Sequence, residues 1–147
     1  MSKCNSTCNG NVTGWSCTGG SASTASNCEE ICGDSKKVGI EFCDDGNTDG
    51  ADKCNSDCTG NVLGWDCQGG SSSAMSTCSP ICGDGLVLGV EVCDDDEDDG
   101  LGCATGCLSI NPLYICPVAG GPSTASVCEV KCGNSKVDPG ETCDDGD

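Results

Sequence analysis

Residues 28–45 read CEEICGDSKKVGIEFCDD, and two later stretches of the chain repeat this pattern. Residues 78–95 read CSPICGDGLVLGVEVCDD, and residues 128–145 read CEVKCGNSKVDPGETCDD. Each stretch has cysteines at its first, fifth and sixteenth positions, and each ends with a pair of aspartates. Self-similarity at a fixed period is the sequence signature of a tandem repeat protein.

The repeat extends over the whole chain of 147 residues. The spacing predicts three repeats, at residues 1–50, 51–100 and 101–147. Met1 aligns with Ala51 and Asp147 with Asn47, so both ends fall in one acidic loop and we expect a window of a longer array. The 18 cysteines form three sets of six: Cys4, Cys8, Cys17, Cys28, Cys32, Cys43; Cys54, Cys58, Cys67, Cys78, Cys82, Cys93; and Cys103, Cys107, Cys116, Cys128, Cys132, Cys143.

Disulfides are the expected source of stability, because only 3% of the residues are aromatic and units this small need covalent staples. Six cysteines in each repeat predict nine disulfides in all and no free thiol, although six cysteines allow fifteen pairings. The chain has neither His nor a Cys-x-x-Cys motif, which argues against zinc. Disulfides persist in oxidising compartments, so we expect an extracellular or cell-surface protein.

The predicted fold class is small and disulfide-rich, with three tandem modules of mostly turns and coil. The alternating residues at 36–42, 86–92 and 136–142 predict short β-strands. No segment has helical periodicity, so little or no helix is expected. No apolar run reaches the length of about eighteen residues that a membrane span requires, which predicts no membrane insertion.

The charge balance excludes several functions. The chain carries 24 acidic and 6 basic residues, a net charge of -18, which repels nucleic acid and attracts cations. Without His, Arg or a nucleophile beside a base, the chain is not expected to be an enzyme.

An acidic loop follows the last cysteine of each set and predicts calcium binding. Residues 45–50 match the D-x-[DN]-x-[DN]-G opening of a calcium loop, and residues 95–100 follow the same pattern with Glu97 at its third position. In such a loop alternate carboxylates converge on one ion. A solvated acidic loop that keeps the protein soluble is the alternative. The candidate ligands are Asp44, Asp45, Asn47, Asp49 and Asp52; Asp94, Asp95, Glu97 and Asp99; Asp144, Asp145 and Asp147; and upstream Glu41, Glu91 and Glu141.

A tract of small residues follows a Gly-Gly pair in every repeat. Its composition suits a flexible or extended linker, and it also suits O-glycosylation. Two Asn-x-Ser/Thr sequences in the first repeat match the N-glycosylation acceptor. The candidate glycan sites are Ser21, Ser23, Thr24, Ser26, Ser71, Ser72, Ser73, Ser76, Thr77, Ser123, Thr124, Ser126, Asn5 and Asn11.

Residues 132–146 resemble the Myxococcus-type cysteine-rich tandem repeat of bacterial and ciliate surface proteins. The resemblance lies in Cys-Gly-Asn, then Gly-Glu-x-Cys-Asp-Asp-Gly, and every repeat shares it in part. Repeats one and two move the glycine by one place, to Gly39 and Gly89, and Asp96 stands where glycine is usual. These departures argue against a uniform loop geometry. The chain also resembles the Lin-Notch repeat, a three-disulfide module that binds calcium. Both resemblances imply an extracellular module, and neither supplies an activity.

The leading hypothesis is therefore a structural protein, in which copies associate head to tail into a fibre, stalk or surface filament. The alternative is a calcium-dependent adhesion or ligand-binding module of a larger surface protein. Repeat three diverges at 108–117, where apolar residues gather. These residues would form either a binding site or the contact between adjacent units.

Overall fold

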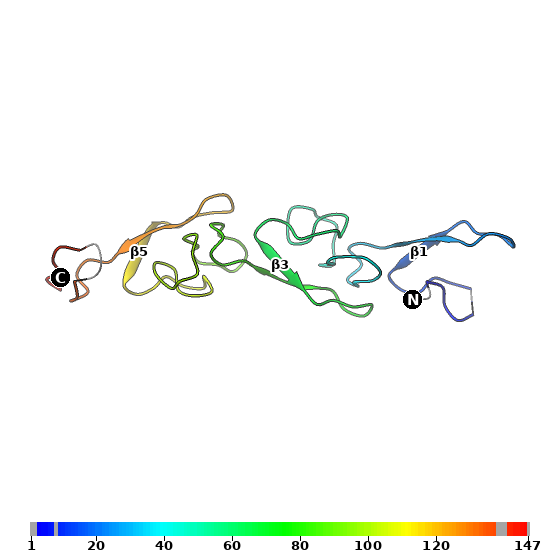
Figure 1. Cartoon of the computed structure of the whole chain (residues 1–147), viewed down its shortest axis with the longest axis horizontal. Helices are drawn as coiled ribbons and strands as arrows, with labels where there is room; N and C mark the ends of the chain where they lie inside the picture. Colours follow the sequence, from blue (N-terminus) through cyan, green and yellow to red (C-terminus); the bar gives the residue numbers. More distant parts are fainter. Residues whose placement is uncertain (1–2, 8, 138–140, 147) are drawn as a thin grey trace. The chain divides into compact units, whose positions relative to one another are not determined.

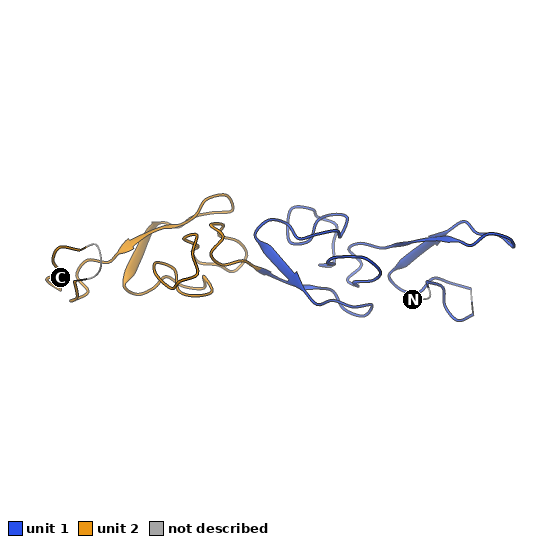
Figure 2. Ribbon diagram, in the orientation of Figure 1, with its two compact units in different colours: residues 1–79 blue, residues 80–147 orange. Residues whose placement is uncertain are grey.

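The structure is a computed structural model that describes residues 3–7, 9–137 and 141–146. The chain divides into two compact units, residues 1–79 and residues 80–147 (Figure 2), and each is described by itself. Within the described ranges, no helix is long and apolar enough to cross a membrane.

Short strands pair into three two-stranded ribbons, whose first strands β1, β3 and β5 are labelled in Figure 1. Residues 3–7, 9–137 and 141–146 contain no helix, so the small disulfide-rich fold class is confirmed. The pairs are β1 (Trp15–Thr18) with β2 (Asn27–Glu30), β3 (Trp65–Gln68) with β4 (Thr77–Pro80), and β5 (Tyr114–Val118) with β6 (Val127–Val130).

The prediction of strands at 36–42 and 86–92 is wrong. Both segments form turns, because Glu41 and Glu91 donate their backbone N–H groups to the carbonyls of Val38 and Leu88, three residues earlier. Gly39 and Gly89 within these turns have φ of 59° and 56°, which a β-strand does not accommodate. The third predicted strand, 136–142, includes residues 138–140, which lie outside the described part of the chain.

The small-residue tracts lie inside the ribbons and do not link one module to the next. Ser21 and Thr24 exchange backbone hydrogen bonds across a tight turn between β1 and β2, and Ser71 and Ala74 do the same between β3 and β4. Each tract therefore caps a hairpin, which corrects the expectation of a flexible or extended linker.

Two kinds of disulfide hold the chain together. One kind crosses each ribbon: Cys17–Cys28, Cys67–Cys78 and Cys116–Cys128. The other kind occurs as nested pairs, in which one bridge closes a loop inside the loop of the other. The nested pairs are Cys32–Cys58 with Cys43–Cys54, and Cys82–Cys107 with Cys93–Cys103.

Each complete module is a ribbon followed by a nested pair. The first module runs from Trp15 to Cys58 and the second from Trp65 to Cys107, so each closes all three of its bridges internally. The nested bridges join residues on both sides of positions 50 and 100, where the repeat limits were placed.

Four cysteines remain outside these seven bridges. Cys132 and Cys143 are unpaired and exposed, Cys4 takes part in other interactions, and Cys8 lies outside the described residues. The expectation of nine bridges stays a prediction for these four.

Disulfide-bonded cysteines, and not aliphatic side chains, form most of the interior. The buried cluster of the first module consists of Cys43, Cys54 and Cys58 with Cys67 of the next ribbon, and Cys93, Cys103 and Cys107 form the second cluster. Large apolar side chains are mostly outside, and Ile40 is 92% exposed. The fold therefore depends on its bridges, because it buries too little apolar surface to be stable without them.

Candidate functional site

A buried carboxylate lies at the centre of the first nested pair. Asp44 follows Cys43 directly and has no exposed surface. Four backbone N–H groups donate hydrogen bonds to its two oxygens, two to each, and we call this arrangement an aspartate cage. Gly33 and Asp34 donate to Oδ2 at 2.9 and 3.2 Å, and Ser35 and Gly46 donate to Oδ1 at 3.0 and 2.9 Å.

Left-handed backbone residues aim these donors at the carboxylate. Gly33, Ser35 and Gly46 have φ of 79°, 68° and 91°. Glycine is required at Gly33, because a Cβ there would lie 2.6 Å from the backbone of Asn47. Successive N–H groups in such turns form a concave site for an anion, which here is supplied by the protein's own side chain.

The second and third cages repeat the first. Asp94 accepts N–H bonds of 2.7 to 3.3 Å from Gly83, Asp84, Gly85 and Asp96. Asp96, which stands where glycine is usual, adopts φ of 74° and donates as Gly46 does. The cage geometry is therefore uniform despite the sequence departures. In the third cage Asp144 accepts from Gly133, Asn134, Ser135 and Gly146 at 2.8 to 2.9 Å.

Each of the first two cages is covered by its own Cys-x-x-x-Cys segment. Cys58 lies beside Asp44, and Cys107 Sγ lies 3.8 Å from Asp94 Oδ2. The segment over the first cage is clasped by two further bonds, from Phe42 N–H to Cys58 O at 2.8 Å and from Cys54 N–H to Asp45 Oδ2 at 3.0 Å. Asp44 and Asp94 consequently have no exposed surface.

A serine of the following ribbon joins each covered cage to the next repeat. Ser76 N–H donates to Asp44 O at 2.7 Å, and Asp44 N–H donates to Ser76 Oγ at 3.2 Å. Ser126 makes the same two contacts with Asp94, at 2.5 and 3.0 Å. Ser76 and Ser126 are only 4% and 5% exposed, so these candidate glycan sites are instead placed at the joints between repeats.

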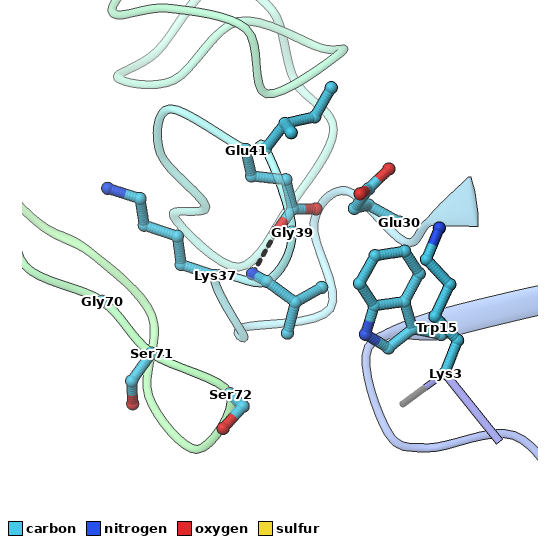
Figure 3. A pocket seen from close by; sticks show the side chains of 11 residues that line it. Lys3, Trp15, Glu30, Lys37, Gly39, Glu41, Gly70, Ser71 and Ser72 are labelled. Carbon is cyan, nitrogen blue, oxygen red and sulfur yellow. Dashed lines mark hydrogen bonds between the residues drawn. The ribbon is translucent and has the colours of Figure 1, made fainter. Parts of the chain in front are cut away.

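Two glutamates near the cages have perturbed acidities. Burial raises the pKa of Glu41, and repulsion from Asp44 and Asp34 adds to the increase, whereas the N–H bond from Val38 opposes it. Figure 3 shows that bond, of 2.7 Å, as a dashed line. Burial likewise raises the pKa of Glu91. The second oxygen of each, Oε1, is buried without a hydrogen-bond partner.

The third cage lacks such burial, and its acid is more easily ionised. Desolvation raises the pKa of Asp144, but the four backbone N–H groups outweigh this effect and lower the pKa below its ordinary value. The four backbone N–H groups therefore favour the ionised form of Asp144.

Most side chains of the acidic loops accept bonds from their own loop. Asn47 Oδ1 accepts from Asp49 N–H at 2.6 Å, and Asp49 Oδ1 accepts from Ala51 N–H at 3.1 Å, as in Asx turns. In the second loop Asp95 accepts from Cys103 N–H and Asp99 from Leu101 N–H. Asp147 lies outside the described residues. Calcium binding by the predicted ligands stays a prediction.

A groove of about 590 Å³ lies in the first unit (Figure 3). Trp15 contributes to its wall but is only 7% exposed. The ammonium of Lys3 lies 4.3 Å from the centroid of the Trp15 ring. The aromatic face is therefore already occupied by a cation–π contact. The other lining residues are Glu30, Lys37, Val38, Gly39, Ile40, Glu41, Gly70, Ser71 and Ser72.

The divergent segment 108–117 is only partly buried. Ile110 packs against the cysteine cluster of the second module, whereas Leu108 and Ile115 are 61% and 44% exposed. Its role in binding or in contact between adjacent units stays a prediction.

Sequence reasoning missed the cage and the joint. Ser26, Ser76 and Ser126 stand two residues before a cysteine in every repeat, and this fixed register within a variable tract was the available signal. The signal for the left-handed turn was the glycine in the Cys-Gly-Asp/Asn motif of every repeat.

These features define a disulfide-stapled tandem repeat whose modules are a bridged hairpin and a cage held by two nested bridges. A family model described as "Domain of unknown function (DUF4215)" matches residues 14–59 and 64–108, and the chain belongs to this family. The two matches enclose the two complete modules. Comparisons with curated proteins and with solved structures give no match.

Proposed function

We propose that the chain is part of an extracellular structural array, a fibre, stalk or surface filament built from repeats that follow one another along one polypeptide or from copy to copy. The observation that carries this proposal is the joint. Ser76 binds Asp44, and Ser126 binds Asp94, through the same pair of hydrogen bonds, one from the serine N–H to the aspartate carbonyl and one from the aspartate N–H to the serine Oγ. A contact that recurs from repeat to repeat suits propagation along an axis.

The covalent pattern supports the same function and location. The seven disulfides among the described residues suit an oxidising, extracellular setting. Modules that close their own bridges resist unfolding and proteolysis, as a surface filament requires. The motif at residues 132–146 supports membership of the Myxococcus-type cysteine-rich repeats, and exposed hairpin tips such as Ser21 and Ser71 are accessible to glycosylation.

Calcium belongs to this proposal as a stabilising cation. The cage aspartates already accept four N–H bonds each, so the oxygens best placed for an ion are the unpartnered Glu41 Oε1 and Asp34 Oδ1 in the first unit. In the second unit Glu91 Oε1, the equivalent of Glu41 Oε1, and Asp95 Oδ1 are buried without a hydrogen-bond partner. Hard carboxylate oxygens of this kind are the ligands that calcium prefers.

The alternative is a ligand-binding or adhesion module, for which the groove beside Trp15 is the relevant observation. Its volume lies within the usual range for ligand sites, about 300 to 1,000 Å³. We favour the structural function, because Lys3 covers the aromatic face that a sugar or peptide would use.

Electron microscopy of native material tests the proposal. We expect filaments with an axial repeat, and discrete particles in millimolar calcium would refute it. Denaturing electrophoresis after reduction then separates the two forms of array. Copies assembled head to tail give the chain mass of 14.6 kDa, and a longer polypeptide gives a far larger mass.

A further inference from the structure

A thioether lies at the joint of the first unit. Met75 directly precedes Ser76, the serine that exchanges two hydrogen bonds with the main chain of Asp44. The Met75 side chain is half exposed, at 53%. A Cβ added at Gly46 would lie 3.5 Å from Met75 Sδ, so the sulfur packs beside the turn at Gly46. The sulfur is therefore open to solvent on one side and lies next to the first cage on the other.

The turn beside this sulfur is part of the cage. Ser35 and Gly46 supply the two N–H groups that bind Asp44 Oδ1, at 3.0 and 2.9 Å. A Cβ at Gly46 would lie 2.8 Å from Ser35 Oγ, so the two donor residues are neighbours in space. Met75 consequently packs against the part of the cage that holds one of the two carboxylate oxygens.

The second unit has the same arrangement without sulfur. Ala125 stands directly before its joint serine, as Met75 does. A Cβ at Gly85 would lie 3.5 Å from Ala125 Cβ. Gly85 and Asp96 supply the two N–H groups that bind Asp94 Oδ1. The residue before the joint serine therefore packs against the same pair of cage donors in both units, and only the first unit has an oxidisable atom there.

A hollow of about 260 Å³ in the first unit gives small molecules access to the thioether. Two of its lining residues are charged, so the hollow suits water and small polar oxidants such as hydrogen peroxide. An accessible methionine reacts with such oxidants to give the sulfoxide. The lining residues are Asp45, Lys53, Met75, Ser76, Thr77 and Cys78.

We propose that Met75 is an oxidation site and that its sulfoxide loosens the joint between the first cage and the ribbon of β3 and β4. This deepens the proposed array, on which it rests, by giving one of its joints a response to peroxide. In the reaction the O–O bond of hydrogen peroxide breaks and one oxygen bonds to Met75 Sδ. The other oxygen leaves as water with both hydrogens. The sulfur loses two electrons and the peroxide gains them.

The added oxygen changes what the side chain prefers to contact. Oxidation converts a flexible apolar side chain into a polar one and disrupts the contacts that it made. The sulfoxide of Met75 favours water over the turn at Gly46, so the side chain turns toward the solvent. The residue before Ser76 then loses its anchor, and the bond from Ser76 N–H to Asp44 O opens more often. The disulfides are unaffected, so each module stays folded while the joint loosens.

The test compares amide hydrogen exchange of the full, disulfide-intact chain before and after treatment with dilute hydrogen peroxide. Mass spectrometry should find one added oxygen on Met75, and the Ser76 amide should exchange about fivefold faster. Ser126 is the internal control, because Ala125 beside it has no sulfur, and its exchange should not change.

Two variants separate this effect from other oxidation. Met75→Leu keeps an apolar side chain that peroxide cannot oxidise, so the same treatment should leave Ser76 unchanged although the exposed thiols of Cys132 and Cys143 meet the same reagent. Met75→Gln places a polar group at the same position, so it should speed the exchange of Ser76 without peroxide.

Complete oxidation of Met75 without faster exchange at Ser76 would overturn the proposal. The same acceleration in Met75→Leu would also overturn it, as would a Met75 that resists peroxide at a dose that oxidises a short methionine peptide. If the joint does not respond while microscopy still finds filaments, the array stands and only its redox response is wrong. If Ser76 responds but the native material contains only discrete particles, the oxidation site stands and the array is wrong.

Discussion

Replacing Asp44 by Asn tests whether the cage stabilises the fold. The side chain keeps its size, but the amide nitrogen cannot accept the two N–H bonds that one carboxylate oxygen now receives. Each oxygen of Asp44 accepts two such bonds in a fully buried setting. Hydrogen bonds to a charged group contribute about 1.5 to 3 kcal/mol each, so the free energy of unfolding should fall by about 3 to 6 kcal/mol.

Asp49→Asn is the matched control. It removes one negative charge from the same loop, but Asp49 is exposed and its Oδ1, which accepts from Ala51 N–H, is retained in Asn. Its effect should stay within about 0.5 kcal/mol, as for most surface substitutions.

Two measurements report the result. Chemical denaturation of the disulfide-intact chain gives the change in unfolding free energy. Amide hydrogen exchange gives the protection of the cage donors Gly33, Ser35 and Gly46, which should fall by about a hundredfold or more if 3 kcal/mol is lost. If Asp44→Asn and Asp49→Asn differ by less than about 1 kcal/mol, with the cage amides equally protected in both, the reasoning about the cage is wrong.

Three further predictions concern neighbouring groups. Asp96→Gly should stabilise the second unit by about 1 kcal/mol, because a left-handed φ of 74° strains any residue with a Cβ; a lower denaturation midpoint would contradict this. Glu41→Gln should stabilise the first unit at pH 7. The raised pKa of Glu41 means that the folded state holds its proton more tightly, so wild-type stability is lost as the pH rises through that pKa. The advantage of Gln should therefore shrink as the pH falls below the ordinary value of 4.5, and a pH-independent difference would count against it. Calcium at millimolar concentration should raise the melting temperature and chelation should lower it, because an ion bound only to the folded state stabilises that state. If calorimetry detects no heat of calcium binding, the loops are solvated acidic loops and not calcium sites.

The cysteine spacing was sufficient to predict the repeat and the disulfide-rich class. It did not predict the pairing, because Cys43 could reach several partners within its own repeat, and its actual partner, Cys54, lies in the next set. The strands were misplaced for a related reason. The apolar alternation around Val38 and Ile40 is real, but the turn at Gly39 and the bond between Val38 and Glu41 override it.

The candidate site was only partly predictable. The Asp-Asp pair after the last cysteine of each set was recognised as important, but as a cation ligand. A charged side chain with no exposed surface is rare, and composition gives no sign of it. What makes Asp44 a structural anion is the left-handed turn at Gly33 and Ser35, which gathers N–H groups around it. Such convergence becomes visible only when distant residues are placed in space.

Disulfide mapping of the non-reduced native protein by mass spectrometry tests the central claim most directly. The nested module predicts that Cys43 is bonded to Cys54 and Cys32 to Cys58, with Cys17 bonded to Cys28 across the first ribbon. A bridge that joins Cys32 or Cys43 to another cysteine of residues 1–50, such as Cys32 to Cys43, would contradict the nested pairs, the covered cage and the array built from them.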